Sequence, residues 1–246
     1  MTQRRTLALS MTLLLLAALP AASTTTITFS GTAHGEVVDT DFAGQGLASI
    51  VVTNIGGGPN LGITFDTTET GTMDPDLEDP WSGGNLPSNT LLGNILVIQE
   101  NATGCGDDVC DVPDDEGTRP AGSIELIFSQ PVTTFGFDLI DVEGTSGPDD
   151  ENGSIVFHDG LSTFTITWDD FESGGAFEVA GLVFGNNHIN RIPEISPGDV
   201  GLTKFDKVVI NMGGSGGIDN LIIPEPATAL LVALGCAGFA VARRRA

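Results

Sequence analysis

Residues 74–79, with the sequence Asp-Pro-Asp-Leu-Glu-Asp, have the spacing in this chain that best suits metal chemistry. They place the carboxylates of Asp74, Asp76 and Asp79 at positions i, i+2 and i+5 of a loop. Calcium takes roughly six to eight oxygen ligands, which carboxylates and backbone carbonyls supply. An EF-hand is excluded, because its sixth loop position must be Gly and here it is Asp79. We therefore expect a structural calcium ion at these aspartates; the alternative is a solvated acidic turn.

The charge of the chain supports a cation site. There are 33 acidic and 9 basic residues, giving a net charge of −24, and no Lys or Arg lies between Asp66 and Glu116. Repulsion among so many carboxylates destabilises a compact state unless cations relieve it. The same charge excludes nucleic acid as a partner, because no basic patch is present to neutralise phosphates.

Two cysteines, Cys105 and Cys110, lie close together in a second acidic segment. An exported chain meets an oxidising compartment, which favours a disulfide between them. The alternative is one half of a zinc site, but no second Cys or His pair lies nearby. Cys236 lies in an apolar segment and has no predicted partner.

The remaining candidates for catalysis are weak. Residues 213–217 read Gly-Gly-Ser-Gly-Gly and formally match a nucleophile elbow, which needs a strand before it and a helix after it. Here strands are predicted on both sides, so we expect a hairpin loop and no catalytic role for Ser215. His34, His158 and His188 share no ligand spacing. Paired carboxylates for glycoside hydrolysis remain an alternative, which the abundance of acids makes hard to test by sequence.

The two tryptophans have separate predicted roles. Trp168 closes an alternating apolar segment and is expected in the core. Trp81 lies in the acidic loop, where we expect it to pin the loop to the domain; the alternative is a flat surface that stacks on a sugar ring.

The elements that position the candidate residues are short apolar runs separated by Gly, Pro, Asn and Asp. Residues 162–168 alternate, so that Phe164, Ile166 and Trp168 face one way and the intervening threonines the other. Many short strands with frequent turns predict an all-β fold, a single β-sandwich or jelly roll over residues 24–223. The expected strands are 26–30, 48–54, 62–65, 94–100, 123–128, 135–139, 153–158, 162–168, 177–184, 205–212 and 218–223. Residues 129–131 and 158–160 are predicted hairpin turns, and 66–93 and 101–120 are predicted long loops.

The N-terminal segment, residues 1–23, has the pattern of a secretory signal peptide. Arg4 and Arg5 precede the apolar residues 7–19, and small residues up to Ser23 provide a cleavage region. This predicts export by the secretion machinery, with cleavage after Ser23.

The C-terminal segment, residues 224–246, carries a more specific pattern. Pro224, Glu225 and Pro226 precede a predicted transmembrane helix at 227–242, and then the basic end Arg243, Arg244 and Arg245. Arginines stay on the cytoplasmic side of a membrane, which leaves the body outside. This segment resembles the PEP-CTERM sorting signal of bacterial exported proteins.

That resemblance implies an address and a processing partner. It implies an exosortase-type enzyme that processes the chain near Pro224–Pro226, a stage anchored in the inner membrane, and then the cell surface or extracellular matrix. The body is similar in style to the β-sandwich domains of many PEP-CTERM proteins and to jelly-roll carbohydrate-binding modules, through residues 74–100, 135–142 and 217–221. Such modules often hold a structural calcium ion.

We therefore expect no enzyme, but an exported structural or carbohydrate-binding module with polysaccharide as a possible ligand. The alternatives are a secreted hydrolase that uses carboxylates and a scaffold without any ligand.

Overall fold

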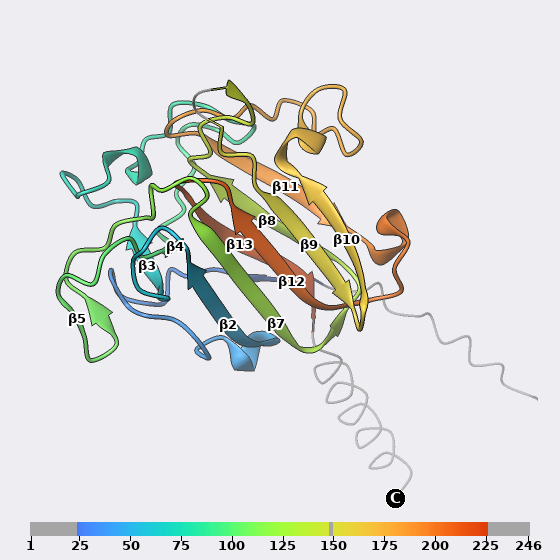
Figure 1. Ribbon diagram of the computed structural model, residues 1–246, viewed down its shortest axis with the longest axis horizontal. Coiled ribbons are helices and arrows are strands. Elements are labelled where there is room, and N and C mark those ends of the chain that lie inside the picture. The colour runs from blue at the N-terminus through green and yellow to red at the C-terminus, as the bar shows by residue number, and fades with distance from the viewer. Residues whose placement is uncertain (1–23, 148–149, 226–246) are drawn as a thin grey trace, which may run out of the picture.

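A computed structural model describes residues 24–147 and 150–225 (Figure 1). The predicted signal peptide, residue Pro226, the predicted membrane helix and the basic end Arg243–Arg245 lie outside the described residues. Within the described residues, no helix has the length and apolar character needed to span a membrane.

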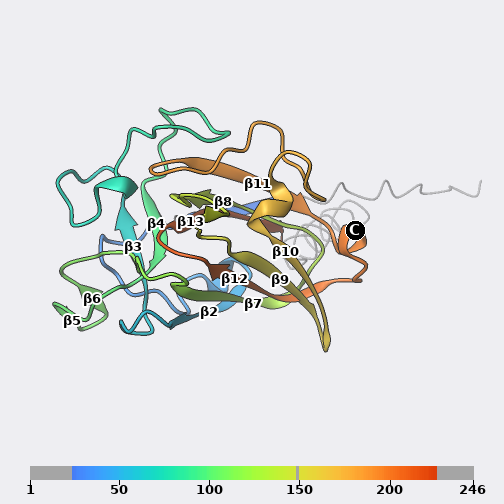
Figure 2. The same cartoon turned by 45° about the horizontal axis from the view of Figure 1, so that its top comes forward.

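The chain folds into two antiparallel sheets packed face to face, which confirms the predicted all-β sandwich. The larger sheet has the strand order β11-β8-β13-β4-β3, with β1 also paired to β13, and the smaller has the order β10-β9-β12-β7-β2. Figure 1 shows the smaller sheet toward the viewer, and Figure 2 separates the two layers. The strands are β1 (Thr24–Ile27), β2 (Leu47–Asn54), β3 (Gly62–Asp66), β4 (Asn94–Ile98), β5 (Cys105–Gly106), β6 (Val109–Cys110), β7 (Gly122–Val132), β8 (Phe135–Ile140), β9 (Ser154–Asp159), β10 (Ser162–Thr167), β11 (Ile189–Ile195), β12 (Phe205–Met212) and β13 (Gly217–Pro224). Short 3-10 turns are η1 (Ala43–Gln45), η2 (Pro75–Leu77), η4 (Trp168–Phe171) and η5 (Pro197–Val200).

The main core lies between the sheets and is rich in phenylalanine. Strand β8 shows how the phenylalanines reach this core. Phe135, Phe137 and Leu139 occupy every second position, so their side chains share one face of the strand and all enter the core. Phe135 and Phe157 meet edge-on across the two sheets, with ring centroids 6.4 Å apart. Trp168 is fully buried in the same core, as predicted.

A second, smaller core covers the outer face of the larger sheet. The long loop between β3 and β4 lies over that face and buries Leu77, Trp81 and Leu92 against strand residues such as Ile95 and Val97. The Trp81 indole N–H donates to the Thr90 carbonyl oxygen at 2.9 Å, within the same loop. Trp81 therefore pins the acidic loop to the sandwich, as predicted, and is 3% exposed.

Three local predictions were wrong. Residues 177–184 do not form a strand. Leu182 and Phe184 are buried in the main core and Phe177 packs against it, but the N–H groups of Phe177 and Val179 donate to the carbonyls of Asp170 and Phe171 instead of to a partner strand. Residues 129–131 are not a turn, because β7 continues through them to Val132. Residues 213–217 join β12 in one sheet to β13 in the other, so they form a crossover between sheets rather than a hairpin.

The sequence prediction also missed strand β11. Its sequence, Ile-Asn-Arg-Ile-Pro-Glu-Ile, breaks alternation, and the pairing with β8 shifts register between Ile192 and Ile195. A bulge of this kind lets Pro193 sit in an edge strand without a ladder hydrogen bond.

The first and last strands close the sandwich together. Thr24 pairs with Pro224 and Ile27 with Leu221, so β1 extends along the second half of β13. Pro224, the first residue of the predicted sorting motif, is thus the last residue of the final strand, and Glu225 follows it.

Candidate metal centre

One end of the larger sheet gathers acidic loops from distant parts of the chain. Strand β13 begins there between two neighbours, because Gly217 pairs with Val97 of β4 on one side and with Ile140 of β8 on the other. Residues that follow β4 and β8 therefore lie at the same end as the start of β13. Gln99, just after β4, forms an isolated bridge with Asp115, which draws the loop before β7 to this end.

Asp115 is held in place by the start of β13. The Gly216 N–H donates to its Oδ2, and the residue is 6% exposed. Gly216 has φ +117°, and a Cβ there would lie 2.3 Å from the Ile140 carbonyl oxygen, so glycine is required for this approach. Burial raises the pKa of Asp115 well above its usual value, and the charge of Asp74 raises it further.

Asp74 approaches from the loop over the second core. As the residue that caps η2, it accepts a hydrogen bond at Oδ1 from the Asp76 N–H at 3.2 Å. Its side chain is about nine-tenths buried, and Oδ2 has no hydrogen-bond partner. Burial raises its pKa. If either carboxyl is protonated, Asp74 and Asp115 can share a hydrogen bond; if both are charged, Oδ2 of Asp74 faces other acids without a donor.

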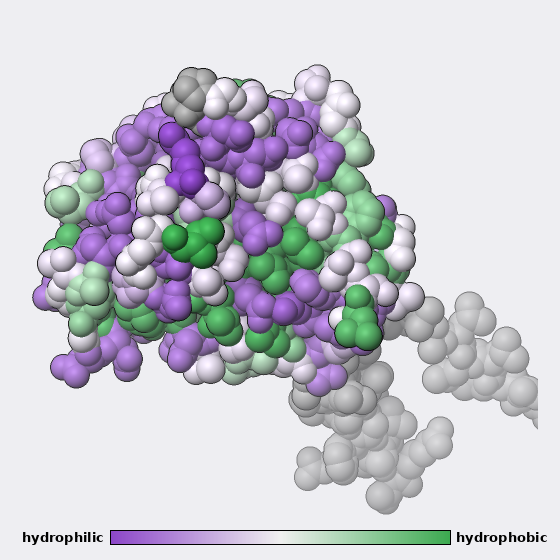
Figure 3. All heavy atoms as spheres, in the orientation of Figure 1, coloured by the Kyte–Doolittle hydropathy of each residue, from purple (hydrophilic) through white to green (hydrophobic). Residues whose placement is uncertain are grey.

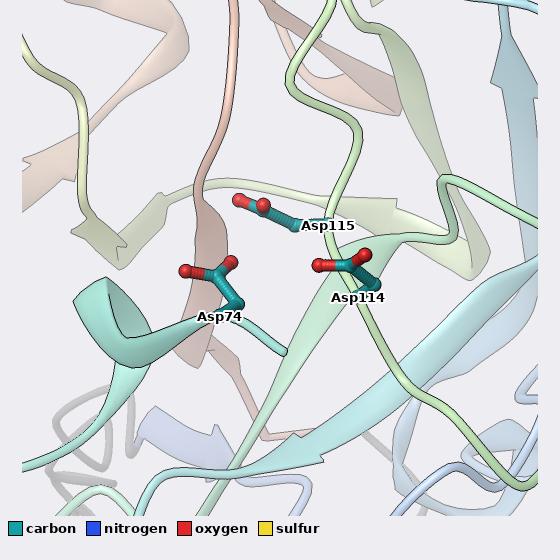
Figure 4. Close-up of side chains that lie close together, drawn as sticks. All are labelled: Asp74, Asp114 and Asp115. Atoms are coloured by element: carbon teal, nitrogen blue, oxygen red, sulfur yellow. The ribbon is translucent and has the colours of Figure 1, made fainter. Parts of the chain in front are cut away.

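Asp114 completes the group. Its backbone N–H donates to Gln99 Oε1 at 3.1 Å, which fixes the loop next to β4. Burial raises the pKa of the Asp114 carboxyl to about 7, assisted by the neighbouring Glu100. One carboxylate oxygen from each of Asp74, Asp114 and Asp115 lies within 4.8 Å of the others, and Figure 4 shows the three side chains around a common space.

Further acids surround this group. Asp141 follows β8, accepts a hydrogen bond from the Asn187 N–H, and has its pKa raised to about 8, by burial first and then by the charge of Asp74. Glu151 is buried and pairs with Arg119 at 3.0 Å. Ser215 lies between them, with its Oγ 3.5 Å from Asp141 and 3.3 Å from Glu151. No helix follows Ser215, so the elbow geometry is absent from the described residues at this point.

The structure brings only Asp74, of the three predicted ligands, into this group. Asp76 accepts a hydrogen bond at Oδ2 from the Asn186 side chain at 2.7 Å. Asp79 follows the turn η2 and lies outside the group, with its N–H bonded to the Thr67 carbonyl at 2.8 Å. Asp76 still lies close enough for its charge to raise the pKa of Asp74 and of Asp141.

Asp114 and Asp115 were not among the predicted ligands. The available signal was the length of the second acidic loop, 101–120, which carries acids and no basic residue before Arg119. Nothing in the sequence indicated that this loop would cross to Asp74. The predicted cysteine pair lies elsewhere in the same loop, where Cys105 and Cys110 form a disulfide that closes the β5–β6 hairpin.

The fold and the site together define an all-β, two-sheet sandwich with a buried acidic cluster that could hold a metal ion. No family model matches the sequence, and no curated protein matches it. Among solved structures, the chain is similar to one described as the K2 cleaved adhesin domain of Lys-gingipain, with a TM-score of 0.35 and 14% identity, over 82% of this chain and 99% of that chain. A likeness this slight carries no information about function.

Proposed function

We propose that this chain is an exported surface or matrix protein whose sandwich is a non-enzymatic module held together by calcium. The cation would bind the carboxylates of Asp74, Asp114 and Asp115. One observation supports the cation: when the carboxyls are ionised, Oδ2 of Asp74 is buried without a donor and lies beside two further carboxylates. A buried charge without a partner is strongly unfavourable, and a bound cation supplies the missing partner.

Calcium fits the group better than zinc or magnesium. All three side chains offer oxygen, whereas zinc sites in proteins favour Cys and His. Two oxygens bound to calcium at about 2.4 Å can lie at most about 4.8 Å apart, and the three oxygens satisfy this limit. Magnesium needs near-octahedral geometry and usually keeps several waters, so it suits an irregular buried group less well.

The bound cation would join two parts of the chain. Asp74 begins the turn that carries Leu77 into the second core, whereas Asp114 and Asp115 are fixed to β4 and β13. Calcium at this position would therefore hold the outer loop layer against the larger sheet. We assign it a structural role for that reason.

Isothermal titration of the purified chain tests the site. We expect one calcium ion per chain, with weaker binding of magnesium, and loss of this binding in Asp74→Asn. Equal uptake of both ions by the wild type and the variant would indicate a diffuse ion atmosphere and would refute the proposed calcium site.

Export and sorting rest on the two ends of the sequence, supported by the disulfide Cys105–Cys110, which suits an oxidising compartment. An exosortase-type enzyme would act at Pro224–Pro226, which begins with the last residue of the final strand. We expect the double variant Glu225→Ala, Pro226→Ala to keep its C-terminal segment in the membrane fraction of the host. Unchanged processing of this variant would overturn the sorting assignment.

A secreted hydrolase is the second candidate, favoured by the carboxyls of Asp114 and Asp141, with pKa values raised to about 7 and about 8. A carboxyl kept protonated near neutral pH can act as a general acid. This candidate predicts glycosidase activity that Asp141→Asn removes, whereas the structural module predicts none in wild type or variant.

A further inference from the structure

The outer face of the smaller sheet carries a hollow of about 400 Å³ at the end nearest the acidic loops. It lies where β7 and β9 begin and β12 ends, and Figure 3 shows the side of the molecule on which this sheet lies. Its polar lining is Ser123, Asn152, Ser154 and Asn211, and Ile55 provides part of its apolar lining.

Small polar side chains run across the whole sheet at this level. Ser123 of β7 pairs with both Thr53 of β2 and Asn211 of β12, and Ser154 of β9 pairs with Asn211 and with Thr167 of β10. Directly paired residues share a face of the sheet, so these five form one continuous row of hydroxyl and amide groups. Asn211 Nδ2 donates to Ser154 Oγ at 2.9 Å, which orients the amide at the centre of the row.

The lining is uncharged, in contrast to the chain as a whole. None of the described residues that line the hollow is acidic or basic, although the chain carries a net charge of −24. A metal ion would need carboxylates and a phosphate would need basic groups or a helix N-terminus, so neither fits this lining. Amides and hydroxyls that both donate and accept hydrogen bonds fit the hydroxyls of a neutral sugar.

The apolar wall suits the same class of ligand. Ile55 follows β2 at the edge of the hollow and is 58% exposed, so its side chain is available to a ligand. A sugar ring presents C–H groups on its faces and hydroxyls at its edge, and would cover Ile55 while its hydroxyls meet the polar row. Sites of this kind combine apolar walls with a few placed polar groups.

We propose that this hollow is a binding site for an uncharged oligosaccharide, recognised by Ser123, Ser154 and Asn211. The inference deepens the proposed function, because it gives the module a ligand class and a location. It does not depend on calcium, since the carboxylates of the metal centre do not line the hollow.

The test titrates the full-length chain, in detergent micelles, with neutral hexasaccharides of glucose, mannose, xylose and N-acetylglucosamine, and with hexagalacturonate as a charged comparison. Binding is followed by saturation-transfer NMR and calorimetry. We expect at least one neutral hexasaccharide to bind at millimolar concentration and hexagalacturonate not to bind. Asn211→Leu should weaken binding by about tenfold, because its removal leaves ligand hydroxyls unpaired. Thr165→Leu is the matched control, since it is exposed on the same face but outside the hollow.

Two results would overturn the inference: failure of every neutral hexasaccharide to bind, or equal binding by wild type and Asn211→Leu. Calcium-dependent melting is measured on the same samples. A rise in melting temperature with calcium but no sugar binding would refute the sugar site and support the calcium site. Sugar binding that depends on Asn211, with no change of melting temperature in calcium, would support the sugar site and refute the calcium site.

Discussion

The carboxylates of Asp74 and Asp115 lie side by side although they belong to two different long loops, one between β3 and β4 and the other before β7. Gly216, directly before β13, fixes Asp115, and the turn η2 fixes Asp74. Two like charges at this separation repel each other strongly when buried. The arrangement is therefore stable only with a proton or a cation between them.

The first prediction separates the cluster from the general acidity of its loops. Asp114→Asn removes one proposed ligand, whereas Asp79→Asn removes an equal charge from an aspartate outside the group. We expect calcium affinity, measured by calorimetry, to fall by about tenfold or more in Asp114→Asn and to change little in Asp79→Asn. An equal loss in both variants would mean that the ion responds only to overall charge.

The second prediction concerns the outer loop layer. Because Asp74 begins the turn that carries Leu77 into the second core, calcium should slow hydrogen exchange in residues 67–81 by several-fold. The turn end of the β9–β10 hairpin, where Asp159 pairs with Ser162, serves as an internal control, because it lies in the other sheet and at the end of β9 away from Glu151. Slower exchange in the hairpin to the same degree would point to a global effect and contradict a local clamp.

The third prediction uses Asp219, a fully buried aspartate of β13 opposite Asp138 of β8. Its Oδ1 accepts a hydrogen bond from the Phe29 N–H at 3.4 Å, and its Oδ2 has no partner. Burial raises its pKa to about 7, with a further contribution from Asp138, while Arg191, which pairs with Asp138, acts in the opposite direction.

The sign of the pH effect follows from that shift. The folded chain keeps the Asp219 proton up to about pH 7, whereas the unfolded chain loses it near the usual aspartate pKa. Stability from this residue is therefore present at acidic pH and is lost as pH rises through about 7. Asp219→Asn should raise the free energy of unfolding at pH 8, by up to about 1.4 kcal/mol for each pH unit that separates the folded and unfolded pKa values, and should have little effect near pH 4. Urea unfolding at both pH values measures this, and an equal effect at both would contradict the assignment.

The fourth prediction concerns the disulfide. Cys105 and Cys110 close a short loop with a sequence separation of 5. Chain entropy for so small a loop predicts that Cys105→Ser, Cys110→Ser lowers the free energy of unfolding by about 2 kcal/mol. Denaturant unfolding of the variant, compared with reduced wild type, checks this value. A loss that appears in the variant but not on reduction would show that packing of Cys110, rather than the bond, is responsible.

The strands of this protein could largely be predicted from its sequence, because alternation reports burial directly. Phe135, Phe137 and Leu139 are apolar at every second position and all enter the main core. Residues 177–184 alternate in the same way, but two of their backbone N–H groups donate to carbonyls of the 3-10 turn η4 rather than to a strand. Alternation alone does not reveal whether a partner strand exists. Strand β11 was not predicted, because Pro193 and the register shift interrupt the alternation of apolar and polar residues.

The acidic cluster could be predicted only in part. Asp74 stood out through its local spacing, but Asp114 and Asp115 meet it through the pairing of β13 with β4 and β8. Such long-range pairing depends on the topology of the sandwich, and no spacing within either loop encodes it. Asp76 and Asp79 share the loop of Asp74 but are not part of the group of three carboxylates.

The most direct test of the account is the melting temperature of the purified chain, measured in calcium, in chelator, and in sodium chloride of equal ionic strength, for wild type and Asp74→Asn. Binding to the folded state alone adds about 2.7 kcal/mol of stability at about a hundredfold excess of calcium over its Kd. We expect a rise of several degrees for wild type that chelator reverses, and none beyond the sodium control for Asp74→Asn. A wild-type rise no larger than in sodium chloride would contradict this and would leave Asp74, Asp114 and Asp115 as a cluster of acids without a cation.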